Sequence, residues 1–263
     1  MNNDLEERYL NLIDNNVNVS KIGAGTEFLY LVAALGIICF SIFFFADAIA
    51  NIVIDNMPNK WQVELEKKLS FGQSSFTESN KHADKIKYLE SVKTKIVRMD
   101  KRLQNKSPLT IHEINEEQVN AFVYPDGNIY FTSKLLEKVD DKESLTFVLG
   151  HELGHYAHRD HLKSIGRELI SGTILFVITL GNKDIASTIG NINSMNQLNH
   201  SQRQEKAADM YGNKILYKLY GRNTGAVKFF KFLKEEENIP EFFYYFSTHP
   251  STEQRLNLIQ RNK

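Results

Sequence analysis

The eleven-residue stretch HELGHYAHRDH, which begins at His151, contains four histidines. His151 and His155 stand four apart, so on a helix their imidazoles project from one face about one turn apart. Neutral imidazole nitrogens bind zinc well, and a catalytic zinc takes three protein ligands and leaves a fourth position for water. Glu152 falls beside that position, where its carboxylate takes a proton from the water. The motif predicts a hydrolytic zinc site that needs one more protein ligand.

His161 is one candidate for this ligand, because the spacing of His151, His155 and His161 equals that of a metzincin. The metzincin motif requires glycine where this chain has His158, so that the helix ends and the chain turns back to the metal. If the helix continues, His161 lies about 9 Å further along the axis and about 240° around it. It then points away from the metal.

Glu205, in the segment QRQEKAADMYG, is the other candidate. In zincins with a distant glutamate, a second helix supplies a carboxylate as third ligand. Asp209 stands four residues later on the same helix face, where it can accept the outer N–H of a liganding histidine and fix that ring. Without the histidine motif, Glu205 and Asp209 would be read as a solvated charged face.

An apolar run from Phe28 to Ala46 is long enough for a helix that crosses the roughly 30 Å hydrocarbon core of a bilayer. A cleaved signal peptide is the rival reading, but the run exceeds a usual signal core and an acidic segment precedes it. We predict a single uncleaved membrane anchor in contact with lipid through residues 28–54. A second apolar run, Leu169–Gly181, is short for a span and predicts a buried or membrane-surface helix.

Composition narrows the possible functions. The chain has 263 residues with 32 basic and 32 acidic side chains, so its formal net charge is zero. A balanced chain gives no support for a nucleic-acid partner, which would require a basic face. Cys39 is the only cysteine and lies in the apolar run, which excludes an intramolecular disulfide and a cysteine ligand in the polar part.

The remaining patterns predict a mainly helical protein with a small antiparallel sheet, of the α+β class. Apolar residues at steps of three and four predict an amphipathic helix within residues 78–106. Short β-rich runs follow from Leu109, with a Pro-Asp-Gly-Asn turn at 125–128. Asp140 and Asp141 can cap a helix from about Lys142 that carries the histidine motif. Further helices are expected at about 200–219, 224–237 and 251–261.

Four segments taken together resemble the membrane-associated zinc metallopeptidases that include HtpX and the CAAX prenyl proteases. These segments are NAFVYPDGNIYFTSKLL from Asn120, HELGH from His151, EKAAD from Glu205 and THPS at 248–251. The resemblance implies one zinc ion held by His151, His155 and Glu205, Glu152 as general base, and His249 as a donor to the tetrahedral oxyanion. The chain departs from HtpX and the prenyl proteases in having a single anchor, which puts a prenyl-protein substrate in doubt.

The expected organisation is a polar tail at 1–27, an anchor at 28–54, a helical lead-in at 55–107 and a zincin-like domain at 108–263. The expected function is cleavage of misfolded, membrane or envelope proteins by a single-pass zinc metalloendopeptidase of the cell membrane. The strand at Asn120 and Ala121 is a candidate edge for binding the substrate backbone. The alternatives are a metzincin that uses His161, a structural zinc protein, and a non-catalytic, chaperone-like zinc-binding protein.

Overall fold

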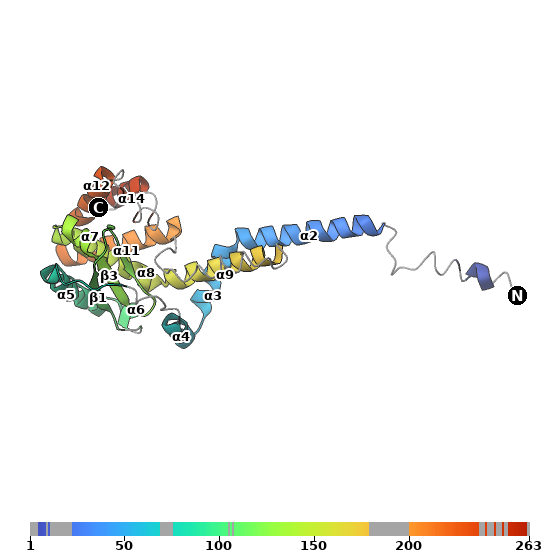
Figure 1. Cartoon of the computed structure of the whole chain (residues 1–263), viewed down its shortest axis with the longest axis horizontal. Coiled ribbons are helices and arrows are strands. Elements are labelled where there is room, and N and C mark those ends of the chain that lie inside the picture. Colours follow the sequence, from blue (N-terminus) through green and yellow to red (C-terminus); the bar gives the residue numbers. More distant parts are fainter. Residues whose placement is uncertain are drawn as a thin grey trace. The chain divides into compact units, whose positions relative to one another are not determined.

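The structure is a computed structural model, shown in Figure 1. It describes residues 5–8, 10, 23–68, 76–104, 106, 108–178, 200–236, 240, 245, 249 and 252–261, with side chains of 174–178 and 252 left out. The chain divides into two compact units, residues 1–45 and 46–263.

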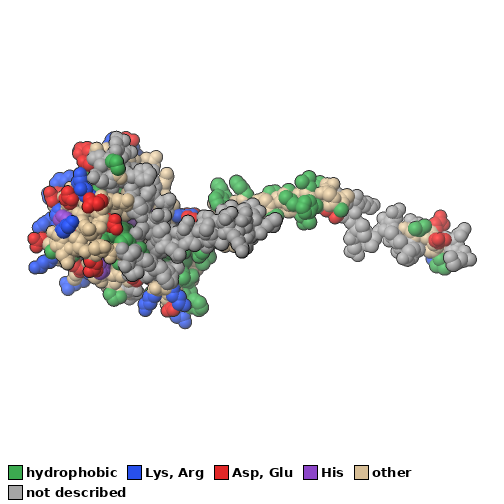
Figure 2. Space-filling view, in the orientation of Figure 1, with side chains coloured by type: hydrophobic (Ala, Val, Ile, Leu, Met, Phe, Trp, Pro, Cys, Tyr) green, Lys and Arg blue, Asp and Glu red, His purple; other side chains and the backbone are tan. Residues whose placement is uncertain are grey.

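The first unit contains helix α2, Ala24–Phe44. Among the described residues it is the one helix long and apolar enough to cross a membrane. Its leucine, isoleucine and phenylalanine side chains are largely exposed, and Figure 2 shows hydrophobic side chains on its surface. The apolar helix predicted from Phe28 to Ala46 is confirmed, with its start four residues earlier and a break at Phe45.

The second unit begins with α3 (Ala46–Asn56) and α4 (Asn59–Lys68). Helix α3 packs on α9, Asp160–Ile178, where a Cβ on Gly166 would lie 3.3 Å from the Cβ of Ala50. The last third of the segment expected to be the anchor, from Ala46, is therefore a separate helix within this unit. The second apolar run, from Leu169, is helical as far as Ile178 and is outside the described residues beyond that point.

The amphipathic helix predicted within residues 78–106 is present as α5 (Ala83–Met99) and the short α6 (Lys101–Gln104). Asp100 interrupts it with extended backbone angles. Leu89, Val92 and Ile96 are fully or almost fully buried, and α5 packs against α8 and β1. The apolar face of α5 thus packs into the hydrophobic core of this unit.

Within the described part of the chain, three strands form one sheet in the order β1-β3-β2: β1 Thr110–Ile114, β2 Ala121–Val123 and β3 Asn128–Thr132. Strands β2 and β3 form the expected antiparallel hairpin, with Gly127 at φ 96° in its turn. The expected mainly helical α+β class with one small sheet is confirmed, but the sheet is mixed and not purely antiparallel, because β1 pairs in parallel with β3. The chain leaves β1 through residues 115–120 and passes to the far edge of β3, so β1 and β2 are not neighbours.

The helical core follows. After α7 (Ser133–Lys138) come α8 (Lys142–His158), α9, α11 (Gln202–Tyr220), α12 (Thr224–Glu235) and α14 (Thr252–Arg261). Asp141 caps α8 by accepting a hydrogen bond from the Ser144 N–H, as predicted. Helices α8 and α11 pack tightly because glycines lie between them: a Cβ on Gly154 would be 3.0 Å from the Cα of Ala208. This close approach brings the histidine motif and Glu205 together.

Candidate metal centre

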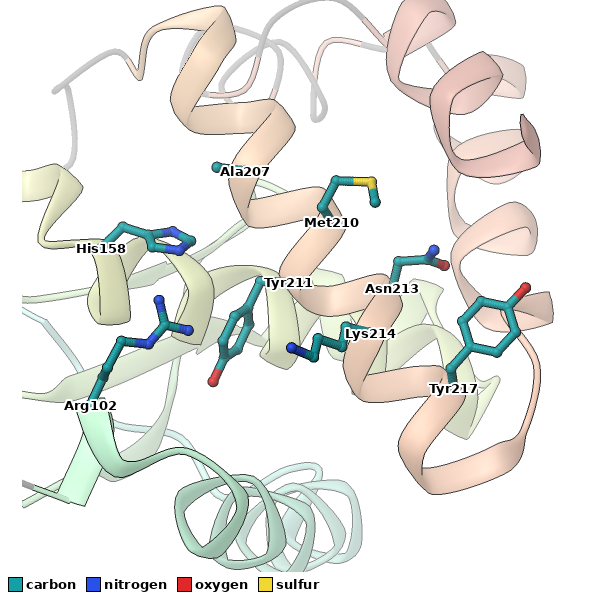
Figure 3. A pocket seen from close by; sticks show the side chains of 8 residues that line it. All are labelled: Arg102, His158, Ala207, Met210, Tyr211, Asn213, Lys214 and Tyr217. Carbon is teal, nitrogen blue, oxygen red and sulfur yellow. The ribbon is translucent and has the colours of Figure 1, made fainter. Parts of the chain in front are cut away.

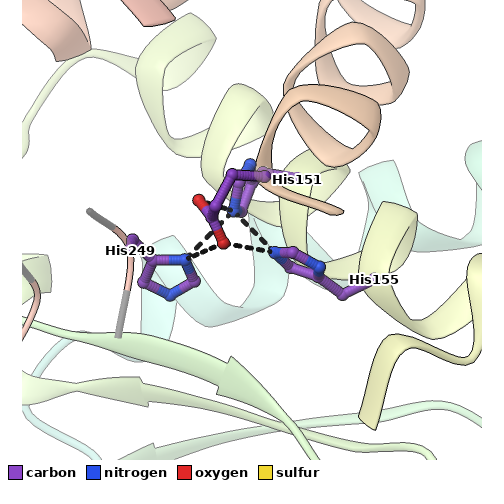
Figure 4. Close-up of side chains that lie close together, drawn as sticks. His151, His155 and His249 are labelled. Carbon is purple, nitrogen blue, oxygen red and sulfur yellow. Dashed lines mark hydrogen bonds and ion pairs between the residues drawn. The ribbon is translucent and has the colours of Figure 1, made fainter. Parts of the chain in front are cut away.

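His151, His155 and Glu205 meet where α8 and α11 pack, and His249 completes the cluster (Figure 4). One potential ligand atom from each residue lies within 4.8 Å of the others, and all four side chains are buried. The Nε2 atoms of His151 and His155 are 3.0 Å apart, and Nε2 of His155 is 3.2 Å from a Glu205 oxygen. Ligand atoms of a tetrahedral zinc lie about 3.3 Å apart, so this spacing fits one zinc ion.

Each of the two motif imidazoles is oriented by a carboxylate that contacts its Nδ1, the ring nitrogen turned away from the cluster. Nδ1 of His151 donates to Asp209 at 3.0 Å, and Nδ1 of His155 donates to Asp160 at 2.8 Å. An ionised carboxylate only accepts hydrogen bonds, so each ring carries a proton at Nδ1, and Nε2 presents its lone pair to the cluster when the ring is neutral. Imidazole presents this face to zinc.

The electrostatics of the cluster favour a cation at its centre. Burial lowers the pKa of His151 to about 4, which keeps this ring neutral. Burial acts in the same direction at His155, but the carboxylates of Asp160 and Glu205 outweigh it and raise the pKa of that ring. Burial would raise the pKa of Glu205, but His249 and Arg255 lower it, so the carboxylate is ionised. The donor set and its charge therefore fit Zn²⁺.

Arg255 of α14 is a buried cation behind the ligands. It donates two 2.7 Å hydrogen bonds to Asp209, and its Nη1 lies 2.8 Å from Oε2 of Glu205. Nη1 also donates to the backbone carbonyl of His249 at 3.3 Å. Arg255 thereby connects three residues of the site. Nothing in its sequence spacing indicated this role.

Glu152 and His249 lie beside the ligands. Glu152 is 2% exposed, and burial raises the pKa of its carboxyl. Nε2 of His249 lies 3.9 Å from the Glu152 carboxylate, while Nδ1 of His249 is 3.1 Å from Glu205 and 3.3 Å from Nε2 of His151. In this arrangement Nδ1 of His249 stands among the ligand atoms.

The segment expected to bind substrate lies at the edge of the sheet. Asn120 and Ala121 are buried, at the start of β2, which packs against α8. The backbone of Asn120 accepts from the Thr132 N–H at 3.1 Å, and its N–H donates to Oγ1 of Thr132 at 3.0 Å. Oδ1 of Asn120 is buried without a hydrogen-bond partner within the described structure. Strand β2 pairs with β3 on one side and is an edge strand of the sheet.

His161 does not join the cluster. It stacks on Tyr156, and its Nε2 lies 3.5 Å from a carboxylate oxygen of Glu66. Helix α8 does not continue past His158, because Arg159 adopts a left-handed conformation with φ 55°. The turn sends His161 towards α4, away from the metal ligands.

Two further histidines, His158 and His200, lie outside the ligand cluster. His200 is half-buried and stacks on His155, with ring centroids 3.9 Å apart. His158 lies on a different surface, a hollow of about 690 Å³ along α11. Figure 3 shows the eight residues that line this hollow, among them Arg102 and Tyr211. Arg102 is paired with Asp100 at 2.8 Å, and no ligand of the cluster lines the hollow.

Comparison with known proteins agrees with this geometry. The model of peptidase family M48 matches residues 85–263. The mitochondrial metalloendopeptidase OMA1 of Danio rerio is 28% identical over 171 residues, which cover 59% of this chain and 35% of that protein. The beta-barrel assembly-enhancing protease of Escherichia coli K12 is 25% identical over 166 residues, covering 57% of this chain and 34% of that protein.

The chain therefore matches about a third of the length of each of these relatives. The family match covers more than half of the chain, including the sheet and all the cluster residues. With the inward-facing histidines on α8 and the carboxylate on α11, it leads to one conclusion: the chain belongs to peptidase family M48, a family of zinc metalloproteases.

Proposed function

We propose that this chain is a membrane-anchored zinc metalloendopeptidase. One observation carries the proposal: Nε2 of His151, Nε2 of His155 and a Glu205 oxygen converge beside buried Glu152, while carboxylates orient both rings. The printed names of the relatives, metalloendopeptidase and protease, support the same reaction. The exposed apolar helix α2 supports the anchor.

The proposed chemistry assigns a role to each residue. His151, His155 and Glu205 would hold the zinc, which when bound polarises the scissile carbonyl and lowers the pKa of a water molecule. Glu152 takes the proton of the attacking water on its carboxylate and delivers it to the leaving amine. Asp209 keeps the proton of His151 on Nδ1, and His249 stabilises the tetrahedral oxyanion.

The substrate is proposed to be an extended protein segment that adds to strand β2. An edge strand offers backbone N–H and C=O groups to any extended chain, so the binding requires little sequence preference. Asn120 and Ala121 begin this edge, and β2 packs against the helix that carries the motif. Misfolded, membrane or envelope proteins offer such segments close to an anchored enzyme. The peptidase domain, expected from residue 108, is proposed to include α5, because the family match begins at residue 85.

Turnover of an unfolded protein tests this function. Wild type and Glu152→Gln, purified side by side, are incubated with unfolded casein and with a denatured membrane protein in detergent. We expect cleavage by wild type and a loss of at least about 10²-fold in Glu152→Gln, since the general base is gone while the zinc ligands remain. Equal cleavage by both would contradict the proposal. Zinc content measured on both samples separates loss of the base from loss of the metal.

A further inference from the structure

The corner between α8 and α9 contacts the metal site on one side and helix α4 on the other. Arg159 turns the chain there with φ 55° and ψ 37°, a left-handed conformation that is strained for a non-glycine residue. The turn places Asp160 behind His155, where Oδ2 accepts the 2.8 Å hydrogen bond from Nδ1. Asp160 is 2% exposed, so this contact is shielded from water.

Asp160 also touches the second ligand helix. Its backbone carbonyl accepts from Nε2 of Gln204 at 3.3 Å. Gln204 closes the capping box of α11 by accepting from the Ser201 N–H at 2.8 Å, and Glu205 is the next residue. The corner is therefore in contact with both helices that supply metal ligands.

A partly buried ion pair holds the corner from the other side. Nε of Arg159 donates to Glu66 of α4 at 3.0 Å, and Nη2 donates to Asn59 at the start of the same helix at 2.7 Å. Glu66 is fully buried, where an unpaired carboxylate would be costly. Helix α4 is thus attached to the turn that positions Asp160.

We propose that Asp160 is a positioning residue for the zinc ligand His155, and that the Glu66–Arg159 pair holds it there and couples α4 to the metal site. The proposal rests on the zinc site proposed above. A carboxylate behind a liganding histidine fixes the ring and raises its basicity, and its loss weakens metal binding about 10- to 100-fold. Glu66 acts on the metal only through Arg159 and Asp160, so its effect is smaller and in the same direction.

The first experiment measures zinc affinity by competition with a chromophoric chelator, using the full chain in detergent. We expect Asp160→Ala to bind zinc about 10- to 100-fold more weakly than wild type. Asp160→Asn should lie between them, because its amide oxygen still accepts from Nδ1. Co²⁺ absorption adds a spectroscopic readout: the visible bands should shift in Asp160→Asn, because the His155 ring is held differently.

The second experiment tests the coupling. Glu66→Gln and Arg159→Gly should each weaken zinc binding, and the double variant should lose no more than either single, as expected for one pair. Glycine adopts positive φ without strain, so Arg159→Gly removes the guanidinium while the turn is retained. Glu64→Gln on the same helix is the matched control, since that side chain is 63% exposed, and it should bind zinc as wild type does.

Wild-type zinc affinity and Co²⁺ spectra in Asp160→Asn, together with wild-type affinity in Glu66→Gln and Arg159→Gly, would overturn the proposal. Thermal unfolding of each variant identifies loss of fold, and Asp160→Asn and Arg159→Gly are the mild substitutions if Asp160→Ala fails to fold. If wild type itself bound no zinc, the function proposed above would fail. If wild type binds zinc and the variants bind it equally, only the positioning role fails.

Discussion

His155 and His161 stand six residues apart, both are buried and both lie near carboxylates, yet their surroundings differ. Around His155 the nitrogens and carboxylate oxygens converge, with Asp160 fixing the ring from behind. Around His161 the carboxylate of Glu66 already has a cation, since Arg159 donates to it at 3.0 Å. In the first region potential ligand atoms from four residues converge, whereas in the second one imidazole faces a carboxylate that Arg159 already pairs. Spacing of histidines alone does not distinguish the two.

Removing the zinc ligand His155 should have the largest effect on zinc binding. In His155→Ala we expect zinc binding to weaken on the order of 10²–10³-fold, because structural zinc sites contribute about 10–16 kcal/mol shared over four ligands. Isothermal titration with Zn²⁺ measures the change. Circular dichroism of the same sample controls for folding. Binding within threefold of wild type would remove His155 from the ligand set.

His249 sharpens the comparison, because its Nδ1 lies among the ligand atoms while its proposed role is to stabilise the oxyanion. We expect His249→Ala to retain zinc and to lose about 10²–10³-fold in kcat, the cost of one oxyanion donor. Metal analysis and steady-state cleavage are measured on one preparation. A loss of zinc as large as that in His155→Ala would instead identify His249 as a ligand.

Close packing of α8 on α11 is what brings Glu205 to His155. Gly154→Ala places a methyl group 3.0 Å from the backbone of Ala208, and we expect the free energy of unfolding to fall by about 1–3 kcal/mol. Chemical denaturation of the detergent-solubilised protein measures it. Gly36→Ala in α2 has nothing within 4 Å of the added methyl group and should not destabilise the protein. Equal stability of the two variants would refute the packing argument.

The region around His161 should show its own pH dependence through Lys106, which lies over the ring of Tyr156 and donates to its backbone carbonyl. Burial, with a smaller contribution from Arg159, lowers the pKa of Lys106 from 10.5 to about 7. Between about pH 7 and pH 10.5, Lys106 is protonated in the unfolded chain and deprotonated in the folded chain. The free energy of unfolding therefore rises with pH in this window, by at most about 1.4 kcal/mol per pH unit.

Lys106→Met lacks this titration, so its free energy of unfolding should rise less between pH 7 and pH 10 than that of wild type. Urea unfolding at pH 7, 8, 9 and 10 compares the two proteins. Parallel curves would show that Lys106 keeps an ordinary pKa in the folded chain.

The parts of the site that depend on local spacing could be predicted from the sequence. His151 and His155 share a helix face because they are four apart, and Asp209 shares one with Glu205 for the same reason. The cap at Asp141 and the hairpin turn at Gly127 also depend on local chemistry, and the structure has both.

The remaining parts depend on contacts between distant segments. Asp160 reaches His155 only because Arg159 adopts a left-handed conformation, which no residue preference at that position indicates. Arg255 lies 46 residues after Asp209 in the chain and contacts it from a different helix. The sequence did not predict the parallel pairing of β1, because the alternation of apolar residues in the strands does not indicate the path of residues 115–120 around β3.

The most direct test of the zinc site is the zinc-to-protein ratio of wild type, Glu205→Ala and His161→Ala after mild dialysis against a chelator. The structure predicts a ratio near one for wild type and His161→Ala and loss of zinc from Glu205→Ala, since Glu205 faces both histidines and His161 faces Glu66. Loss of zinc from His161→Ala with retention in Glu205→Ala would contradict the ligand set of His151, His155 and Glu205.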